Sequence, residues 1–181
     1  MDEFMKLAEQ LLVYRIRFAW HEIARMYNDM ASEYDVTLSM GFILLTINEE
    51  YGTPVTKIAP RMGMKPNSLS RILRSMEDKG LVFRKKDEAD KRLVYICLTD
   101  LGKDRKRIAL DAVFRLNNAL IKDLPPEKIN AFFEVMDQVP KAVEEMREAI
   151  KNPSSNQELT GWGFDDTAPT DTLNSENGNP S

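Results

Sequence analysis

The sequence predicts a mainly α-helical protein that carries one small β-hairpin, and three observations support this fold class. Apolar residues recur at helical spacing in long stretches before residue 50 and after residue 99. Between residues 81 and 98, two short runs rich in β-branched and aromatic residues flank a charged segment, which is typical of a hairpin. With 181 residues, 43% hydrophobic and 30% charged, the chain suits one folded domain plus an extension.

The N-terminal part of the sequence predicts two helices. Residues 3–31 place large apolar side chains on more than one side of a helix. In so small a chain, this indicates that another chain covers part of the helix. Residues 35–37 interrupt the pattern and include a capping residue, and a second helix is expected over Leu38 to Glu50.

The next stretch predicts a short helix, a glycine-containing turn and another helix. Thr53 is expected to cap a helix that Pro54 begins, because the N–H that proline lacks is not needed at the first helical position. Gly63 makes the turn, Pro66 starts the next helix and Gly80 closes it. Residues at i, i+3, i+4 and i+7 of that helix form its expected buried face: Leu69, Ile72, Leu73 and Met76.

The opposite surface of this second helix is short, polar and cationic, as a helix lying in a DNA major groove needs to be. It exposes the candidate DNA-contacting residues Asn67, Ser68, Ser70, Arg71 and Arg74. Arg71 and Arg74 can reach guanine edges or phosphates from this face. The alternative is that either arginine only forms a surface ion pair with Glu77 or Asp78.

A hairpin follows, with strands expected in the runs 81–83 and 93–98 around the charged tip 84–92. A helix-turn-helix followed by such a hairpin is a winged helix-turn-helix. The tip residues predicted to contact phosphates are Lys85, Lys86 and Lys91. Arg92 is predicted to enter the minor groove, and Asp90 to orient it by a charge-assisted hydrogen bond. A solvated hairpin tip is the alternative.

The C-terminal part predicts two long helices and a tail. Thr99 is expected to cap a helix that runs to about Lys122, and a Leu-Pro-Pro sequence then stops it. Pro140 is expected to kink or interrupt the last helix. The final 30 residues, 152–181, contain five acidic residues and no lysine or arginine, and predict a disordered acidic tail. Its two aromatic residues, Trp162 and Phe164, form a small docking motif or have no role.

Charge is distributed unevenly along the chain, whose net charge is −4. Residues 54–110 hold 15 basic and 7 acidic residues, a balance of +8, whereas the rest of the chain has a balance of −12. Because salt screens charges within roughly 10 Å, phosphate attraction depends on the local balance and not on the total. The acidic whole chain is therefore compatible with DNA binding.

Several other protein classes find no support in the sequence. It has no glycine-rich phosphate loop, no nucleophile elbow and no metal-ligand spacing, so no catalytic residue, metal or cofactor is expected. No apolar run approaches the ~18 residues that span a membrane, and no secretion signal is recognised. The single cysteine, Cys97, excludes an internal disulfide, and a cytoplasmic protein is expected.

Two stretches resemble the MarR family of bacterial transcription regulators, namely SLSRILRSMEDKGLV and DEADKRLVYICLTDLGK. Members of this family show an acidic-x-basic wing tip and then a strand that ends in Leu-Thr-x-x-Gly. The corresponding residues here are Asp90-Lys91-Arg92 and Leu98-Thr99-Asp100-Leu101-Gly102. The resemblance covers residues 1–151, with a DNA-binding lobe over 34–98 and dimerisation helices over 1–33 and 99–151.

The resemblance also implies a homodimer that binds a palindromic site in double-stranded DNA. In this family, small-molecule effectors bind where the dimerisation helices meet the DNA-binding lobe. On that basis the candidate effector-pocket residues are Arg17, Trp20 and His21. A lone helical histidine is otherwise an ordinary, partly buried residue.

Two features depart from the family pattern. Lys65 stands before Pro66, where a serine or threonine cap would be usual, so it weakens the cap and adds a candidate phosphate contact. Cys97 lies in a wing strand, and not in the N-terminal helix where the peroxide-sensing members keep their reactive cysteine. A small half-buried thiol and a redox sensor are both open readings of Cys97.

The sequence therefore predicts a dimeric, sequence-specific DNA-binding repressor that a small-molecule effector releases. The alternative hypothesis is a winged-helix module that binds a partner protein and not an operator, which the acidic tail and the acidic last helix favour.

Overall fold

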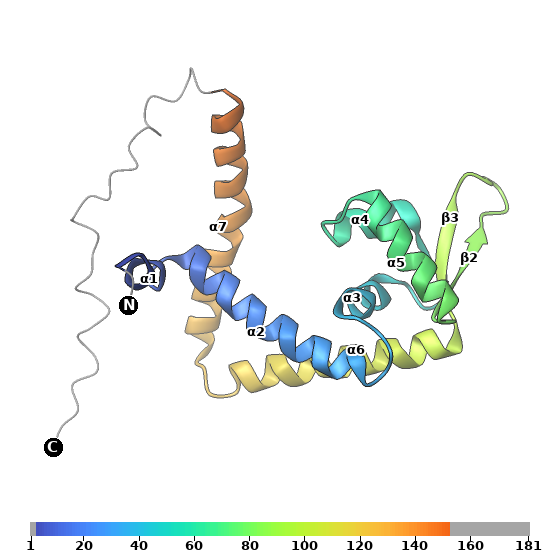
Figure 1. Ribbon diagram of the computed structural model, residues 1–181, viewed down its shortest axis with the longest axis horizontal. Coiled ribbons are helices and arrows are strands. Elements are labelled where there is room, and N and C mark those ends of the chain that lie inside the picture. The colour runs from blue at the N-terminus through green and yellow to red at the C-terminus, as the bar shows by residue number, and fades with distance from the viewer. Residues whose placement is uncertain (1–2, 153–181) are drawn as a thin grey trace. The chain divides into compact units, whose positions relative to one another are not determined.

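The computed structural model describes residues 3–152, and Figure 1 shows their path. The elements follow in the order α1 (Glu3–Ala8), α2 (Leu12–Ser32), α3 (Leu38–Thr46), β1 (Thr53–Pro54), α4 (Val55–Arg61), α5 (Pro66–Asp78), β2 (Val82–Lys86), β3 (Val94–Leu98), α6 (Asp100–Ile121) and α7 (Pro126–Lys151). The predicted fold class, mainly α-helical with a small β-structure, is confirmed. Apart from Asn152, the predicted acidic tail lies outside the described residues. Among the described helices, none is long and apolar enough to cross a membrane.

Two compact units make up the chain, and each is described by itself. The first ends at Lys122 and contains α1 to α6 with the sheet, and the second begins at Asp123 and contains α7. Of the two effects expected from Pro140, an interruption does not occur, because α7 stays helical through it. Proline removes only its own N–H bond, and a helix of 26 residues continues on both sides of the loss.

The sheet has three antiparallel strands in the order β1-β3-β2, one more than the predicted hairpin. β2 and β3 form the hairpin, which we call the wing, with Val82 opposite Leu98 and Lys86 opposite Val94. β2 reaches Lys86, so the tip is shorter than the sequence predicts. Burial alternates along the end of β3: Ile96 and Leu98 are buried, and Cys97 on the other face is half-buried.

The expectation that Thr53 caps a helix begun by Pro54 is wrong. Thr53 pairs with Ile96 as part of β1, and α4 begins at Val55. The Thr53 hydroxyl is buried and accepts a hydrogen bond from the Asn48 N–H (2.9 Å), while it donates to the Thr46 carbonyl (3.3 Å). A hydroxyl already engaged in the turn after α3 is not available to cap α4.

Two helix boundaries also differ from the prediction. α3 ends at Thr46 and not at Glu50, because the Asn48 side chain accepts the N–H groups of Glu50 and Tyr51 (3.0 and 2.8 Å) and holds a turn there. The single helix expected over 3–31 is divided into α1 and α2. At this break the Arg15 Nε donates to the Glu9 carbonyl (2.7 Å), which a continuous helix would use internally.

The core of the first unit lies between α3, α4, α5 and the sheet. Its fully buried large side chains are Ile43, Leu44, Ile47, Ile58, Leu69, Leu73, Met76 and Ile96. The predicted buried face of α5 is confirmed at Leu69, Leu73 and Met76, while Ile72 is half-buried at its edge. Figure 1 shows that α4 and α5 lie beside the wing, so this core supports the polar face of α5 from behind.

One junction joins the end of α5, the start of the wing and the start of α6. The Thr99 hydroxyl accepts the Gly102 N–H (2.9 Å) and donates to the Gly80 carbonyl (2.6 Å). The Thr99 N–H donates to the Leu81 carbonyl (3.1 Å). A Cβ on Gly102 would lie 2.0 Å from the Leu81 carbonyl oxygen, so only glycine lets α6 approach this closely.

We predict that Gly102→Ala destabilises the protein by roughly 1–3 kcal/mol, because the added methyl group overlaps backbone that cannot rotate away. Urea unfolding followed by circular dichroism measures the change.

Gly41→Ala is the matched control, since Gly41 is also helical but has no atom within 4 Å of the added Cβ. It should raise the free energy of unfolding by up to about 1 kcal/mol through helix propensity. Equal stability of the two variants would contradict the close approach at Leu81.

Candidate nucleic-acid interface

The polar face of α5 is exposed along its whole length. Asn67, Ser70, Arg71 and Arg74 are exposed, and Ser68 is half-buried near the N-terminus. The Ser70 hydroxyl donates to the Pro66 carbonyl (3.0 Å) and so turns back toward its own helix. Lys65 stands at the N-cap position, its side chain makes no capping bond, and it is exposed. Pro66 has no N–H, and the Ser68 and Leu69 N–H groups donate to the Lys65 carbonyl (3.0 and 3.2 Å), so the Asn67 N–H is the first-turn donor left open to an anion.

Arg71 and Arg74 form no ion pair with any residue between 3 and 152. The surface pairs that sequence analysis kept as the alternative are therefore not made. Glu77 instead binds Arg84 of β2, whose Nε lies 3.0 and 3.1 Å from its two carboxylate oxygens. Sequence analysis did not single out Arg84, because nothing in the local pattern distinguishes it from its basic neighbours.

The wing tip is an ordered turn built on two aspartates. The Asp87 carboxylate accepts the N–H groups of Ala89 and Asp90 (2.9 and 2.8 Å). Asp90 in turn accepts the Arg92 N–H (3.0 Å) and the Arg92 Nε (3.1 Å) through its Oδ1. The Arg92 side chain is 92% exposed, so its guanidinium is oriented while remaining open to a ligand.

These hydrogen bonds lower the pKa of Asp90. The Arg92 side chain is the larger cause and the Arg92 backbone N–H the second, since both favour the charged carboxylate. The Asp90–Arg92 pair therefore contributes its full stability at pH values above the ordinary carboxyl pKa. That contribution is lost only as the pH falls through the lowered pKa of Asp90. The wing tip thus keeps its geometry at neutral pH.

Ion pairing divides the positive charge of residues 54–110 into two groups. Seven of the fifteen basic side chains pair with carboxylates, and these include all four in the first turns of α6. The eight that make no ion pair within the described part of the chain all lie on α4, α5 and the wing or in the loops that join them: Lys57, Arg61, Lys65, Arg71, Arg74, Lys85, Lys86 and Lys91. Within residues 54–110, the basic side chains without an ion pair therefore gather on the winged helix.

The basic start of α6 is neutralised locally. Lys106 is only 15% exposed, donates to the Ile47 carbonyl (2.7 Å) and lies 3.3 Å from a Glu49 carboxylate oxygen. Arg105 and Arg107 both bind Asp104 (2.8 and 2.7 Å). This helix start therefore contributes to internal packing.

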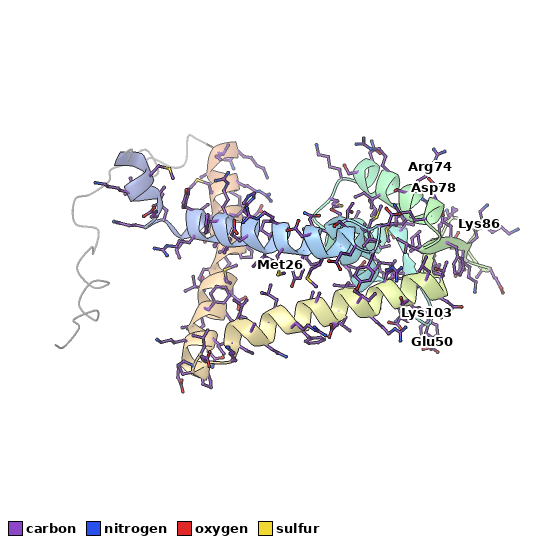
Figure 2. The ribbon with its side chains drawn as sticks, turned by 60° about the horizontal axis from the view of Figure 1, so that its bottom comes forward. Met26, Glu50, Arg74, Asp78, Lys86 and Lys103 are labelled. Carbon is purple, nitrogen blue, oxygen red and sulfur yellow. The ribbon has the colours of Figure 1, made fainter. Side chains whose placement is uncertain are left out.

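Strand alternation separates the two lysines of β2. Lys86 shares a face with Val82, which is buried, and with Arg84, which contacts α5. Lys85 points to the opposite face, across from Tyr95. Figure 2 shows Lys86 and Arg74 of α5 at the same end of the first unit, with Lys103 of α6 on a different side. Lys86 therefore lies on the face of β2 whose Arg84 contacts α5.

The candidate effector residues Arg17, Trp20 and His21 lie within about one turn of α2, and all three are exposed. Trp20 stacks on Phe42 of α3 with ring centroids 6.0 Å apart. It also lines an open groove of about 430 Å³ together with Leu38, Leu45, Met62 and Met64. Arg17 and His21 do not line this groove.

A second space lies between α2, α3 and α6, and the sequence did not indicate it. This apolar cavity of about 60 Å³ is lined by residues that include Tyr27, Met30, Ile108 and Arg105. The Arg105 guanidinium stacks over the Tyr34 ring, 5.2 Å from its centroid. Helical periodicity identifies such residues as core, and only the folded chain shows the unfilled space between them.

Within residues 3–152, no cluster of three histidine, cysteine or acidic side chains is arranged to hold a metal.

A model of the MarR family matches residues 36–94, which cover α3, the helix-turn-helix and most of the wing. The HTH-type transcriptional regulator SarZ of Staphylococcus epidermidis is 30% identical over 90 residues, which are 50% of this chain and 61% of that relative. The chain thus matches about three fifths of the length of this curated relative.

Two solved structures have a similar fold. The S. aureus MepR–DNA complex has a TM-score of 0.67 and 21% identity, covering 73% of this chain and 98% of the MepR chain. Reduced AbfR bound to DNA has a TM-score of 0.58 and 27% identity, covering 78% of this chain and 96% of the AbfR chain. Residues 36–94 thus match the MarR family, and the chain has a MarR-like winged helix-turn-helix fold.

Proposed function

We propose that the chain is a DNA-binding transcriptional regulator without enzymatic activity. The observation that carries this proposal is the distribution of basic side chains, because all eight between 54 and 110 that lack an ion pair lie on the winged helix and its connecting loops. An exposed cluster of uncompensated cations attracts phosphate even though the net charge of the chain is −4. The fold shared with MepR and AbfR, which were both solved with DNA, supports the same reading.

In this proposal α5 is the recognition helix and lies in the major groove. Arg71 and Arg74 contact base edges or phosphates from its exposed face, and Asn67, Ser68 and Ser70 lie closer to its N-terminus. Lys65, together with the Asn67 N–H of the first turn, contacts a phosphate. Lys85, Lys86 and Lys91 bind phosphates from the wing.

The wing tip reaches the neighbouring minor groove through Arg92, with Asp90 as the residue that orients it. A guanidinium held by a carboxylate loses less conformational entropy on binding than a free one, so the pair prepares Arg92 for insertion.

We predict that Arg92→Ala weakens DNA binding roughly 10-fold to 100-fold, because an inserted guanidinium contact is lost. Asp90→Asn should cause a smaller loss in the same direction, since it removes only the orienting charge. Fluorescence anisotropy with a duplex enriched by in vitro selection against the full chain measures both changes.

Glu88→Gln is the matched control, because Glu88 is an exposed acid of the same tip. It should bind DNA as tightly as the parent or slightly tighter. If the Arg92→Ala variant binds DNA as tightly as the parent, Arg92 does not contribute to the DNA interface.

We also propose that two copies assemble, with segments 1–33 and 99–151 as dimerisation helices and 34–98 as the DNA-binding lobe. Large apolar side chains are exposed on α2 and α6, including Val13 (77%), Phe18 (61%), Phe114 (56%) and Leu120 (58%). Extended apolar surface of this kind normally belongs to an interface. A twofold dimer would present two copies of α5 to a palindrome with half-site centres about 10 base pairs apart.

We predict that Phe114→Asp shifts the protein from dimer to monomer in sedimentation velocity, because a carboxylate cannot be buried in an apolar interface without a partner. Arg115→Gln, at an exposed position that faces away from Phe114 around α6, should leave the dimer intact. Monomeric parent protein at micromolar concentration would contradict the assembly.

Finally, we propose that the regulator is a repressor that a small molecule releases from DNA. The groove beside Trp20 lies between α2 and the turn that precedes α5, so a ligand there would contact the segment that sets the position of α5. The apolar groove walls favour an apolar or aromatic ligand. The proposal for this groove fails if Trp20→Ala leaves the response of DNA affinity to every active ligand unchanged.

A further inference from the structure

Arg84 of β2 connects the wing to the helix proposed to read DNA. Its Nε lies 3.0 Å from Oε1 and 3.1 Å from Oε2 of Glu77, on the last full turn of α5. The side chains are 40% and 28% exposed, so solvent screens this pair less than a fully exposed one. Among the ion pairs of the described residues, this is the one that joins α5 to the wing.

Glu77 occupies a position where a carboxylate would interfere with DNA binding. It lies three residues after Arg74, and side chains at this spacing are neighbours on a helix. A carboxylate without another partner would attract the Arg74 guanidinium and repel phosphates. In the structure Arg84 holds the carboxylate, and Arg74 makes no ion pair with any described residue.

We infer that Arg84 is a positioning residue for DNA binding, which engages Glu77 and thereby leaves Arg74 available to the DNA. This inference rests on the proposed function, because it assigns Arg84 a role in the same interface. The pair also fixes β2 against α5, and Lys86 shares the face of β2 that carries Arg84. Loss of the Arg84–Glu77 pair therefore affects both α5 and the wing.

A direct phosphate contact is the competing role for Arg84, and Glu77 distinguishes the two roles. If Arg84 acts through Glu77, removing the carboxylate makes the arginine dispensable. If Arg84 binds a phosphate itself, its loss costs the same with or without the carboxylate. A double-mutant cycle measures this difference.

The experiment compares Arg84→Met, Glu77→Gln and the double variant with the parent, as full chains, on a fluorescein-labelled duplex obtained by in vitro selection. Arg84→Met should bind roughly 5-fold to 10-fold more weakly than the parent, since Glu77 then competes for Arg74. In the Glu77→Gln background, Arg84→Met should change affinity by less than about twofold and leave the salt dependence unchanged. Arg84→Lys should recover most of the affinity, because an ammonium group also engages the carboxylate.

Lys85→Gln is the matched control on the adjacent, opposite-facing position of β2. As a proposed direct phosphate contact, it should lower the affinity equally in both Glu77 backgrounds and reduce the slope of log K against log salt by roughly one. The positioning role is overturned if Arg84→Met behaves in this additive way, or if it has no effect on affinity. Circular dichroism melting identifies any variant that fails to fold, and Arg84→Gln then takes the place of Arg84→Met.

A measurement without DNA separates failure of this inference from failure of the proposed function. Exchange of the Arg84 Nε–H, followed by NMR in the DNA-free protein, should be slow in the parent and fast in Glu77→Gln. Fast exchange in the parent would show that the Arg84–Glu77 ion pair does not persist without DNA, and it would overturn the inference whatever the DNA result. Slow exchange in a parent that binds no duplex would overturn the proposed function and with it the positioning role.

Discussion

The close approach of α6 to the Leu81 carbonyl is the constraint on which the rest of the first unit depends. Gly102 permits this approach because it has no Cβ. The Thr99 hydroxyl stabilises it by accepting a hydrogen bond from the Gly102 N–H and donating one to the Gly80 carbonyl. The end of α5, the first strand of the wing and the start of α6 therefore meet at one point. This backbone contact sets where α5 and the wing begin relative to α6, and the Arg84–Glu77 ion pair adds a second link between α5 and the wing.

Pairing of charges explains how a chain with a net charge of −4 presents a cationic surface. Three of the acidic residues near the winged helix are paired: Asp35 with Lys79, Glu77 with Arg84 and Asp90 with Arg92. The basic residues of α6 are engaged in the same way and drop out of the surface charge. The basic residues of 54–110 that remain unpaired lie around α5 and on the wing, so local pairing adds to the basic composition of this segment in producing the proposed binding surface.

Sequence reasoning predicted the elements that rest on local signals and missed those that rest on distant partners. The turn at Gly63, the Thr99 cap, the buried face of α5 and the alternation in β3 each follow from residues within one element. Thr53 was misread because its partners, Asn48 and Ile96, come from a turn and a strand elsewhere in the chain. Arg84 was missed for the same reason, because its partner Glu77 lies on α5. In the sequence, Arg84 is one basic residue among several.

The most direct test of the central proposal is the salt dependence of DNA binding by the full chain. Binding to a selected duplex should weaken steeply as salt rises, with log K falling linearly against log salt at a slope of about −5 or steeper, because several lysines and arginines of each protomer would displace counterions from phosphates. A random duplex should bind more weakly with a slope of similar size. Binding that is absent, or that does not change between low and physiological salt, would contradict a DNA-binding role for the winged helix.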